Sequence, residues 1–172
     1  MSNETEMKDN VREDVYDKEL FDRLLDQNDI DEFRKEFLEL HNYEQSEYFE
    51  DTDDENRQKI FEFLSPKEVA NFFDQLDFDD DDYESLFDNM DATYASHVLE
   101  EMSYDNAVDI LNELSKPKVA SLLTLMNKDK ANEIKALLHY EEDTAGGIMT
   151  TEFISLKSTT PVKEALDRKS VV

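Results

Sequence analysis

The sequence predicts an all-α protein built as a superhelical, solenoid-like stack of short helices. The first observation is a repeat of roughly 12 residues, marked by large apolar anchor residues. The second is that six of the seven anchors are followed directly by a residue type that caps helix N-termini. The third is composition, because two Gly and three Pro in 172 residues are too few for the turns of a β-sheet protein. The anchors are Leu64, Leu76, Met90, Met102, Leu114, Met126 and Leu138.

The repeat predicts helices of only about nine or ten residues. Within one unit the apolar residues lie 5, 8, 9 and 12 positions after the anchor, which follows the helical period. The capping residue after each anchor then ends one helix and starts the next. Helices this short are unstable alone in water, so they must stack on their neighbours. A four-helix bundle with coincidental spacing is the alternative, and it requires fewer and longer helices.

The helical domain is expected to span residues 11–139, after a disordered N-terminus at residues 1–10. Apolar residues from Val11 to Leu25 predict a first helix, and Asn28 is expected to cap a second one. Residues 41–62 carry weaker anchors and denser acids, which predicts a loosely packed turn of the array. The apolar face of the second helix comprises Ile30, Phe33, Phe37 and Leu40.

The clearest helix start lies at Ser65-Pro66-Lys67-Glu68. Serine at the cap, proline at the first helical position and glutamate at the third form a capping box. A step of 14 residues separates Leu76 from Met90, which predicts a longer acidic loop at residues 78–82. Four regular units follow from Met90 to Leu138.

The repeat ends after His139, and a different segment begins. A junction at residues 140–151 contains the chain's two glycines, Gly146 and Gly147, side by side. Paired glycines serve positive φ angles or close backbone approach. Residues 153–156 then predict a short strand, and residues 162–167 the start of a helix. Residues 152–172 are therefore expected to be the truncated start of another domain.

A net charge of −27 dominates the electrostatics of the chain. Such a surface repels nucleic acid and anionic membranes and attracts cations or basic partners. The charge is uneven: residues 42–91 carry 18 Asp and Glu against three basic residues, whereas residues 115–139 carry five Lys against two acids. There is no Cys, and no apolar run approaches the ~20 residues that cross a bilayer. We expect a soluble segment without direct membrane insertion.

The sequence offers little for catalysis, so the protein is not expected to be an enzyme. Its three histidines lie in different units without a nucleophile pattern, and there is no glycine-rich phosphate loop. The acids from Asp51 resemble an EF-hand loop in spacing, but Asn56 stands where that loop needs glycine and Lys59 stands at position 9. We therefore reject an EF-hand.

Asp105 and Asp109 are the strongest candidates for metal binding. They lie four residues apart in one unit, so their carboxylates share a helix face. Mg²⁺ commonly takes one or two carboxylates and keeps several waters. The alternative is that Asp105 only interacts with the helix dipole and Asp109 is only exposed. Spacing alone leaves both interpretations open.

The segment Tyr140-Glu-Glu-Asp-Thr-Ala-Gly-Gly-Ile-Met-Thr-Thr-Glu-Phe153 resembles a known junction. It is similar to the sequence that joins the N-terminal helical domain of MgtE-type magnesium transporters to their paired CBS domains. The helical array resembles the N domain of that family, and residues 152–172 resemble the start of its first CBS domain. The resemblance covers roughly residues 20–167.

This resemblance implies a regulatory role. It implies a Mg²⁺-sensing domain on the cytoplasmic face of the cell membrane, part of a magnesium transporter or channel. The cofactor would be weakly bound regulatory Mg²⁺, which bridges the acidic surface to the CBS domains and closes the pore. The implied partners are the CBS and transmembrane domains of the same transporter, within a homodimer, and no nucleic acid.

The resemblance also assigns metal ligands by position. The family's acid pair corresponds to Asp105 and Asp109, and a backbone oxygen corresponds to Gly147. An acid of an earlier repeat corresponds to Asn71, which offers an amide oxygen but no charge, so this bridge is either lost or served by a neighbouring acid such as Asp74. The alternative function is a protein-interaction scaffold like the helical repeats of the flagellar motor switch protein FliG. That alternative explains the array and the lysines from Lys116 to Lys135, but not the glycine junction.

Overall fold

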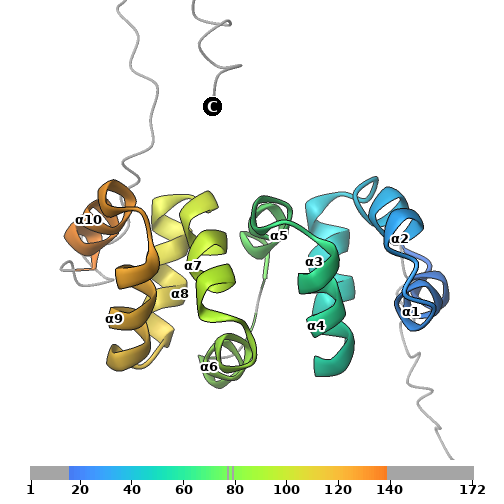
Figure 1. Ribbon diagram of the computed structural model, residues 1–172, viewed down its shortest axis with the longest axis horizontal. Coiled ribbons are helices and arrows are strands. Elements are labelled where there is room, and N and C mark those ends of the chain that lie inside the picture. Colours follow the sequence, from blue (N-terminus) through green and yellow to red (C-terminus); the bar gives the residue numbers. More distant parts are fainter. Residues whose placement is uncertain (1–15, 77, 79, 139–172) are drawn as a thin grey trace, which may run out of the picture. The chain divides into compact units, whose positions relative to one another are not determined.

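The computed structural model describes residues 16–76, 78 and 80–138 (Figure 1). Over these residues the chain forms ten α-helices and no strand, which confirms the all-α prediction. The predictions for residues 1–10, for the glycine junction and for the CBS fragment fall outside the described residues. No helix within the described part is both long and apolar enough to span a bilayer.

The chain divides into two compact units at Ser65 and Pro66. The first unit contains α1 (Lys18–Asp26), α2 (Ile30–Phe37), α3 (Asn42–Glu50) and α4 (Asp54–Phe63). The second contains α5 (Pro66–Phe73), α6 (Asp80–Asn89), α7 (Ala92–Glu101), α8 (Tyr104–Glu113), α9 (Lys116–Leu125) and α10 (Lys128–Leu137). Each helix has 8 to 10 residues, so the prediction of many short helices is confirmed and the four-helix bundle is excluded.

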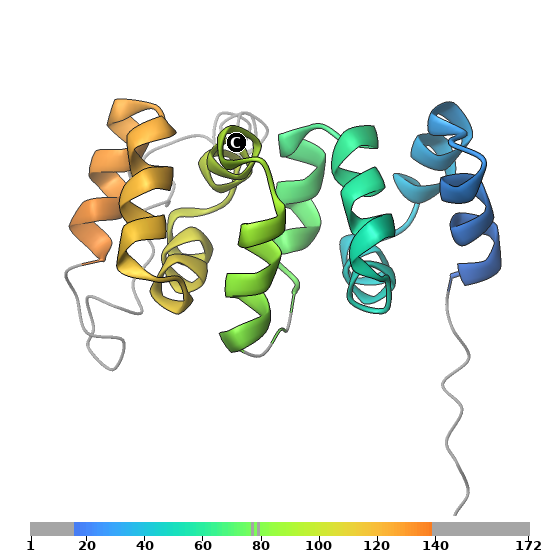
Figure 2. The same cartoon turned by 60° about the horizontal axis from the view of Figure 1, so that its bottom comes forward.

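Helices of the second unit pack mainly on the next helix but one. α7 lies between α5 and α9, while α8 contacts both α6 and α10 (Figures 1 and 2). Two rows of alternating helices result, which is how an array of short repeats buries a continuous core. This arrangement is the superhelical stack that the 12-residue repeat predicts.

The apolar anchors end the helices of the second unit. Met102, Leu114 and Met126 are buried C-cap residues in extended conformation, so the chain turns there and a new helix begins two residues later. The residues after them are N-caps, as predicted. However, the side chains of Ser103 and Ser115 make no capping hydrogen bond, whereas those of Asp91 and Asn127 do.

Aromatic side chains form the core of the first unit. Phe21 packs edge-on against Phe33 and Phe37, with ring centroids 5.8 and 5.7 Å apart. Tyr48 lies against Phe21 and donates a 3.0 Å hydrogen bond to Asp22. Burial, with the nearby carboxylate, raises the pKa of Tyr48 far above its usual range, so the phenol stays a neutral donor.

Three predictions for the first unit are wrong in detail. Asn28 does not cap α2; it adopts a left-handed conformation with φ of 55°, and Asp29 caps the helix by accepting from the Glu32 amide. Asparagine tolerates this conformation better than most residues, so it forms the turn instead. Residues 41–62 are not loose, because they form α3 and α4 with Tyr48 and Phe49 fully buried. Ile30 was expected on the buried face but is 41% exposed.

Candidate metal site

Helix α8 carries both acids of the predicted metal site. Its apolar face buries Ala107, Val108, Ile110 and Leu111 against neighbouring helices. Asp105 and Asp109 are four residues apart, so they share another side of the helix. Asp109 is exposed, and Asp105 lies half-buried in the first turn.

The carboxylate of Asp105 has an unused acceptor. Its Oδ1 atom is buried and accepts no hydrogen bond from any described residue. A buried carboxylate oxygen without a donor is costly, because its lost hydration is not replaced. A bound cation would replace that hydration. The interpretation of Asp105 as a residue that only interacts with the helix dipole does not explain this oxygen.

A cavity brings a third acid toward Asp109. Asp74, which follows α5, and Asp109 both line a cavity of about 120 Å³, together with Asn106. Tyr83 of α6 forms another wall and donates a 3.2 Å hydrogen bond to the Leu76 carbonyl. Two carboxylates and an amide, one from the end of α5 and two from α8, therefore line one small cavity.

Asp109 also lines a second cavity, of about 170 Å³. This cavity contains Glu113, one turn further along α8, and Phe78 and Tyr83 form its apolar side. Neither Asn106 nor Glu113 was among the residues predicted from the sequence. They lie three residues before and four residues after Asp109, which places them on the same face of α8. This spacing is the sequence signal that could have identified them.

The structure separates the two earlier-repeat candidates. Asp74 is half-buried and lines the cavity with Asp109, whereas Asn71 is exposed and does not line it. Gly147 lies outside the described residues. Among the described residues no group of three or more His, Cys, Asp or Glu side chains is arranged to hold a metal. Since hard cations take six or more oxygen ligands, waters and further donors would complete any site here.

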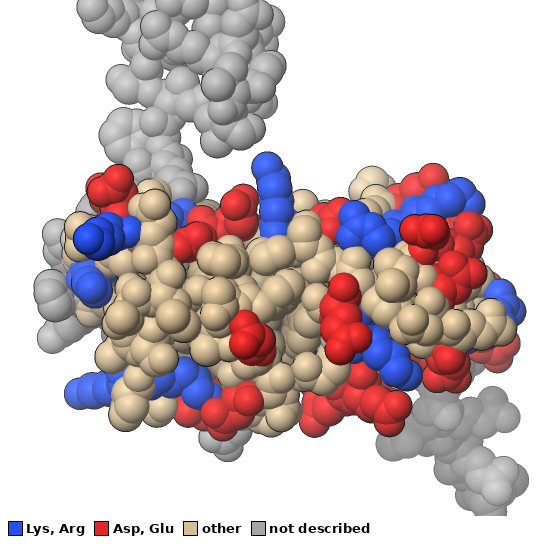
Figure 3. Space-filling model, viewed as in Figure 1, with Lys and Arg blue, Asp and Glu red and all other residues tan. Residues whose placement is uncertain are grey.

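Positive charge gathers at the other end of the second unit. Lysine side chains lie over the α9–α10 end on the face shown in Figure 3, as the uneven sequence charge predicts. Lys118 of α9 pairs with Asp88 and Glu84 of α6, at 2.6 and 3.3 Å. Lys130 of α10 lies 3.6 Å from the ring centroid of Tyr104, a cation–π contact.

Comparison with known proteins identifies the family. Residues 40–143 match the family described as the MgtE intracellular N domain. The chain belongs to this family. The MgtE resemblance found in the sequence is thereby confirmed, and family membership favours a transporter domain over a FliG-like scaffold.

MgtE relatives agree with the assignment. The chain is 45% identical over 137 residues to the magnesium transporter MgtE of Enterococcus faecalis. The aligned region covers 80% of this chain and 30% of that protein. It is similar to the crystal structure of the soluble part of a magnesium transporter, with a TM-score of 0.82 and 42% identity over 87% of this chain and 59% of the other. The chain thus spans less than a third of the curated MgtE relative.

A more distant MgtE structure shows the fold alone. The cytosolic domain of the Mg²⁺ channel MgtE in complex with ATP matches with a TM-score of 0.74 and 23% identity. The match covers 90% of this chain and 63% of the other. The all-α array is therefore shared across MgtE domains of quite different sequence.

Proposed function

We propose that this chain is the Mg²⁺-sensing regulatory domain of a magnesium transporter, located on the cytoplasmic face of the membrane. Mg²⁺ would bridge its acidic surface to the CBS domains of the same transporter, within a homodimer, and hold the pore closed. The role is regulatory and not enzymatic. The observation that carries the proposal is the α8 acid pair, with the bare Asp105 oxygen and with Asp74 facing Asp109 across one cavity.

The electrostatics of the chain suit such a switch. Two carboxylates near 4 Å repel by about 1 kcal/mol in water, and by more at lower dielectric. With a net charge of −27, this surface would repel a second acidic surface unless cations lie between them. A sensor of cellular Mg²⁺ needs weak sites, near millimolar, each worth about −4 kcal/mol. Several weak sites acting together supply the free energy that shifts a two-state equilibrium.

We assign the ligands in the following way. Asp105 and Asp109 supply carboxylates from α8, and the backbone oxygen of Gly147 supplies a neutral ligand. Asp74 takes the place of the acid expected in the earlier repeat, because it lines the cavity with Asp109 and Asn71 does not. Waters retained by Mg²⁺ and acids of the CBS domains would complete the coordination.

The first test removes the α8 acid pair in the full-length transporter. The resistance of the transporter to protease digestion is measured at increasing Mg²⁺ concentrations, for the wild type and for the double variant Asp105→Asn/Asp109→Asn. We expect the midpoint Mg²⁺ concentration to rise about tenfold or more, which corresponds to ~1.4 kcal/mol of lost binding. The matched control is Asp129→Asn/Glu133→Gln, an exposed acid pair of the same spacing on α10. Equal midpoints in the two double variants would remove the α8 pair from the sensor.

A second test separates Asp74 from Asn71. In the same assay Asp74→Asn should raise the Mg²⁺ midpoint, because the cavity it shares with Asp109 loses a charge. Asn71→Ser should leave the midpoint unchanged, since this exposed side chain lies outside that cavity. The opposite pattern would mean that Asn71, the position suggested by the resemblance, supplies the ligand instead of Asp74.

A further inference from the structure

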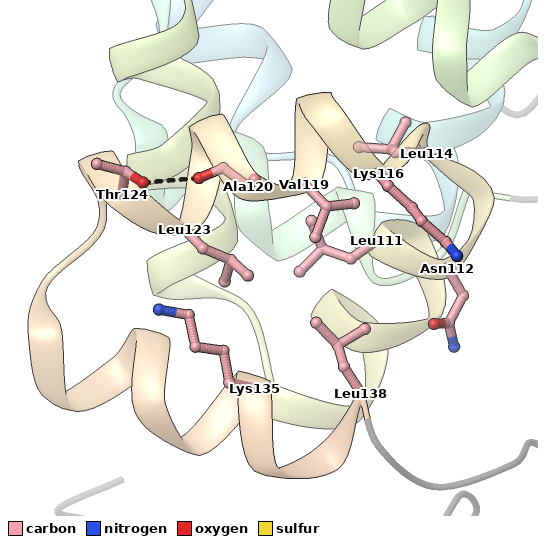
Figure 4. A pocket seen from close by; sticks show the side chains of 10 residues that line it. All are labelled: Leu111, Asn112, Leu114, Lys116, Val119, Ala120, Leu123, Thr124, Lys135 and Leu138. Atoms are coloured by element: carbon pink, nitrogen blue, oxygen red, sulfur yellow. Dashed lines mark hydrogen bonds between the residues drawn. The ribbon is translucent and has the colours of Figure 1, made fainter.

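A groove of the second unit lies among α8, α9 and α10. It has a volume of about 520 Å³, within the range of ligand and peptide sites (Figure 4). Lys116 extends beside Asn112 on one side, and Lys135 reaches toward Leu123 on the other. The apolar lining comprises Leu111, Leu114, Val119, Ala120, Leu123 and Leu138.

The two lysines of the groove have no partners in the described part of the chain. Lys118 and Lys130, on the same two helices, form ion pairs, hydrogen bonds or cation–π contacts with other helices. Lys116 and Lys135 form no such contact among described residues. Two unpaired ammonium groups beside an apolar surface, in a chain of net charge −27, suit an acidic segment with an apolar side chain.

We propose that this groove docks the chain's own next segment, Tyr140–Asp143. Leu138 lines the groove, and Tyr140 follows it by only two residues in the sequence. It reads Tyr-Glu-Glu-Asp, which offers one aromatic ring for the apolar lining and three carboxylates for the two lysines. A buried tyrosine ring contributes 150–250 Å² of contact area, about what one docked side chain can supply.

The length of the segment permits this docking. Three to five residues beyond Leu138 reach at most ~10–17 Å, which exceeds the 8–10 Å between the axes of packed helices. Because the segment is tethered, its effective concentration at the groove is in the millimolar range or above. Weak exposed ion pairs therefore suffice to hold it.

Docking of this segment would also bring Gly146 and Gly147 close to the proposed metal site. This second part of the proposal rests on the proposed Mg²⁺-sensing function. Asn112 lines the groove and lies three and seven residues after Asp109 and Asp105, on the same face of α8. Seven helical residues span about 10.5 Å. Gly147 follows Asp143 by four residues, which can cover that distance when extended. The docked segment would thus hold the Gly147 carbonyl near both acids.

Cysteine crosslinking tests the docking directly, because the chain has no native Cys. The rate of intramolecular disulfide formation is measured in the 172-residue chain carrying Asn112→Cys and Asp143→Cys. The control carries Asn132→Cys and Asp143→Cys, with Asn132 exposed on α10 and outside the groove. Asn132 is nearer in sequence, so loop closure alone favours the control. We expect the groove pair to crosslink about tenfold faster. Equal rates, or a disulfide between two chains, would overturn the proposal.

Charge reversal tests the role of the lysines. Adding Lys116→Glu and Lys135→Glu should slow the groove crosslink about three- to tenfold, as expected for lost exposed ion pairs. Lys128→Glu, an exposed lysine of α10 outside the groove, should not slow it. An unchanged rate in the double reversal would overturn the pairing. All rates are measured in EDTA, so failure here is distinct from failure of Mg²⁺ sensing, which the Asp105/Asp109 titration decides.

Discussion

At the scale of single residues, acids of one helix satisfy the backbone at the start of another. The Glu84 carboxylate accepts a 2.9 Å hydrogen bond from the Ser115 amide, at the N-terminus of α9. Glu100 does the same for the Asn127 amide at the start of α10. Because the Ser115 hydroxyl makes no capping bond, the N-terminus of α9 takes its acceptor from α6. The stack is therefore bonded through its helix ends as well as through its core.

The bond from the Ser115 amide lowers the pKa of Glu84 below its usual value of 4.5, and Lys118 adds to the effect. A lowered folded-state pKa means that this contribution to stability is present above pH 4.5 and is lost as pH falls through the folded pKa. We expect Glu84→Gln to lower Tm at pH 7, with the difference from wild type shrinking below pH 4.5. Thermal unfolding followed by circular dichroism at several pH values measures this. Glu133→Gln, an exposed acid of α10, provides the control, and an equal loss in both variants would contradict the capping role.

At the scale of helices, the sequence predicted the repeat well because the anchors act locally. A buried residue in extended conformation followed by a capping residue ends one helix and begins another, whatever the rest of the fold does. The start of α2 and the packing of residues 41–62 were mispredicted, because both depend on more than the local pattern. Asn28 and Asp29 are both capping types, and only backbone conformation decides between them. Buried Thr52 replaces an anchor by donating to the Tyr48 carbonyl, a bond that a hydropathy pattern does not reveal.

From residue spacing alone, the candidate site was predicted only where it depends on one helix, and Asp74 entered only through the family resemblance. Asp105 and Asp109 follow from spacing within α8. The approach of Asp74 to Asp109 does not, because it joins residues 35 positions apart through the packing of α5, α6 and α8. A single sequence carries no signal for that approach.

Asp91 caps the N-terminus of α7 with its side chain and should be needed for the stability of this helix. Its carboxylate accepts from the amides of Thr93 and Tyr94, at 3.0 and 2.9 Å. Removing such a cap costs about 0.5–2 kcal/mol, so Asp91→Ala should lower the free energy of unfolding by this amount. Urea denaturation measures it, with Glu133→Ala as a control that removes the same charge from an exposed site. The cap would be unimportant if both variants lost the same stability.

At the scale of the whole molecule, charge and stacking oppose each other. The core is built from buried apolar residues of nearly every helix. The whole chain, however, contains 45 acidic residues and only 18 basic ones. Exposed ion pairs such as Lys35–Glu32 relieve little of this repulsion, because each contributes about 0–1 kcal/mol. Excess negative charge destabilises the compact state, so the acids are tolerated at a cost in stability. The metal-dependent interface proposed above would give that cost a function.

Salt should therefore stabilise this chain. Raising NaCl from about 10 to 150 mM shortens the Debye length from about 30 to 8 Å, which screens repulsion among the acids. We expect Tm to rise over this range, and to rise further in MgCl₂ at equal ionic strength, because dications would also occupy the proposed α8 site. Asp105→Asn/Asp109→Asn should keep the NaCl response and lose part of the Mg²⁺ excess. A fall of Tm with NaCl would mean that ion pairs outweigh repulsion. The acidic surface would then stabilise the isolated domain, and the argument that it is kept for Mg²⁺ would lose its basis.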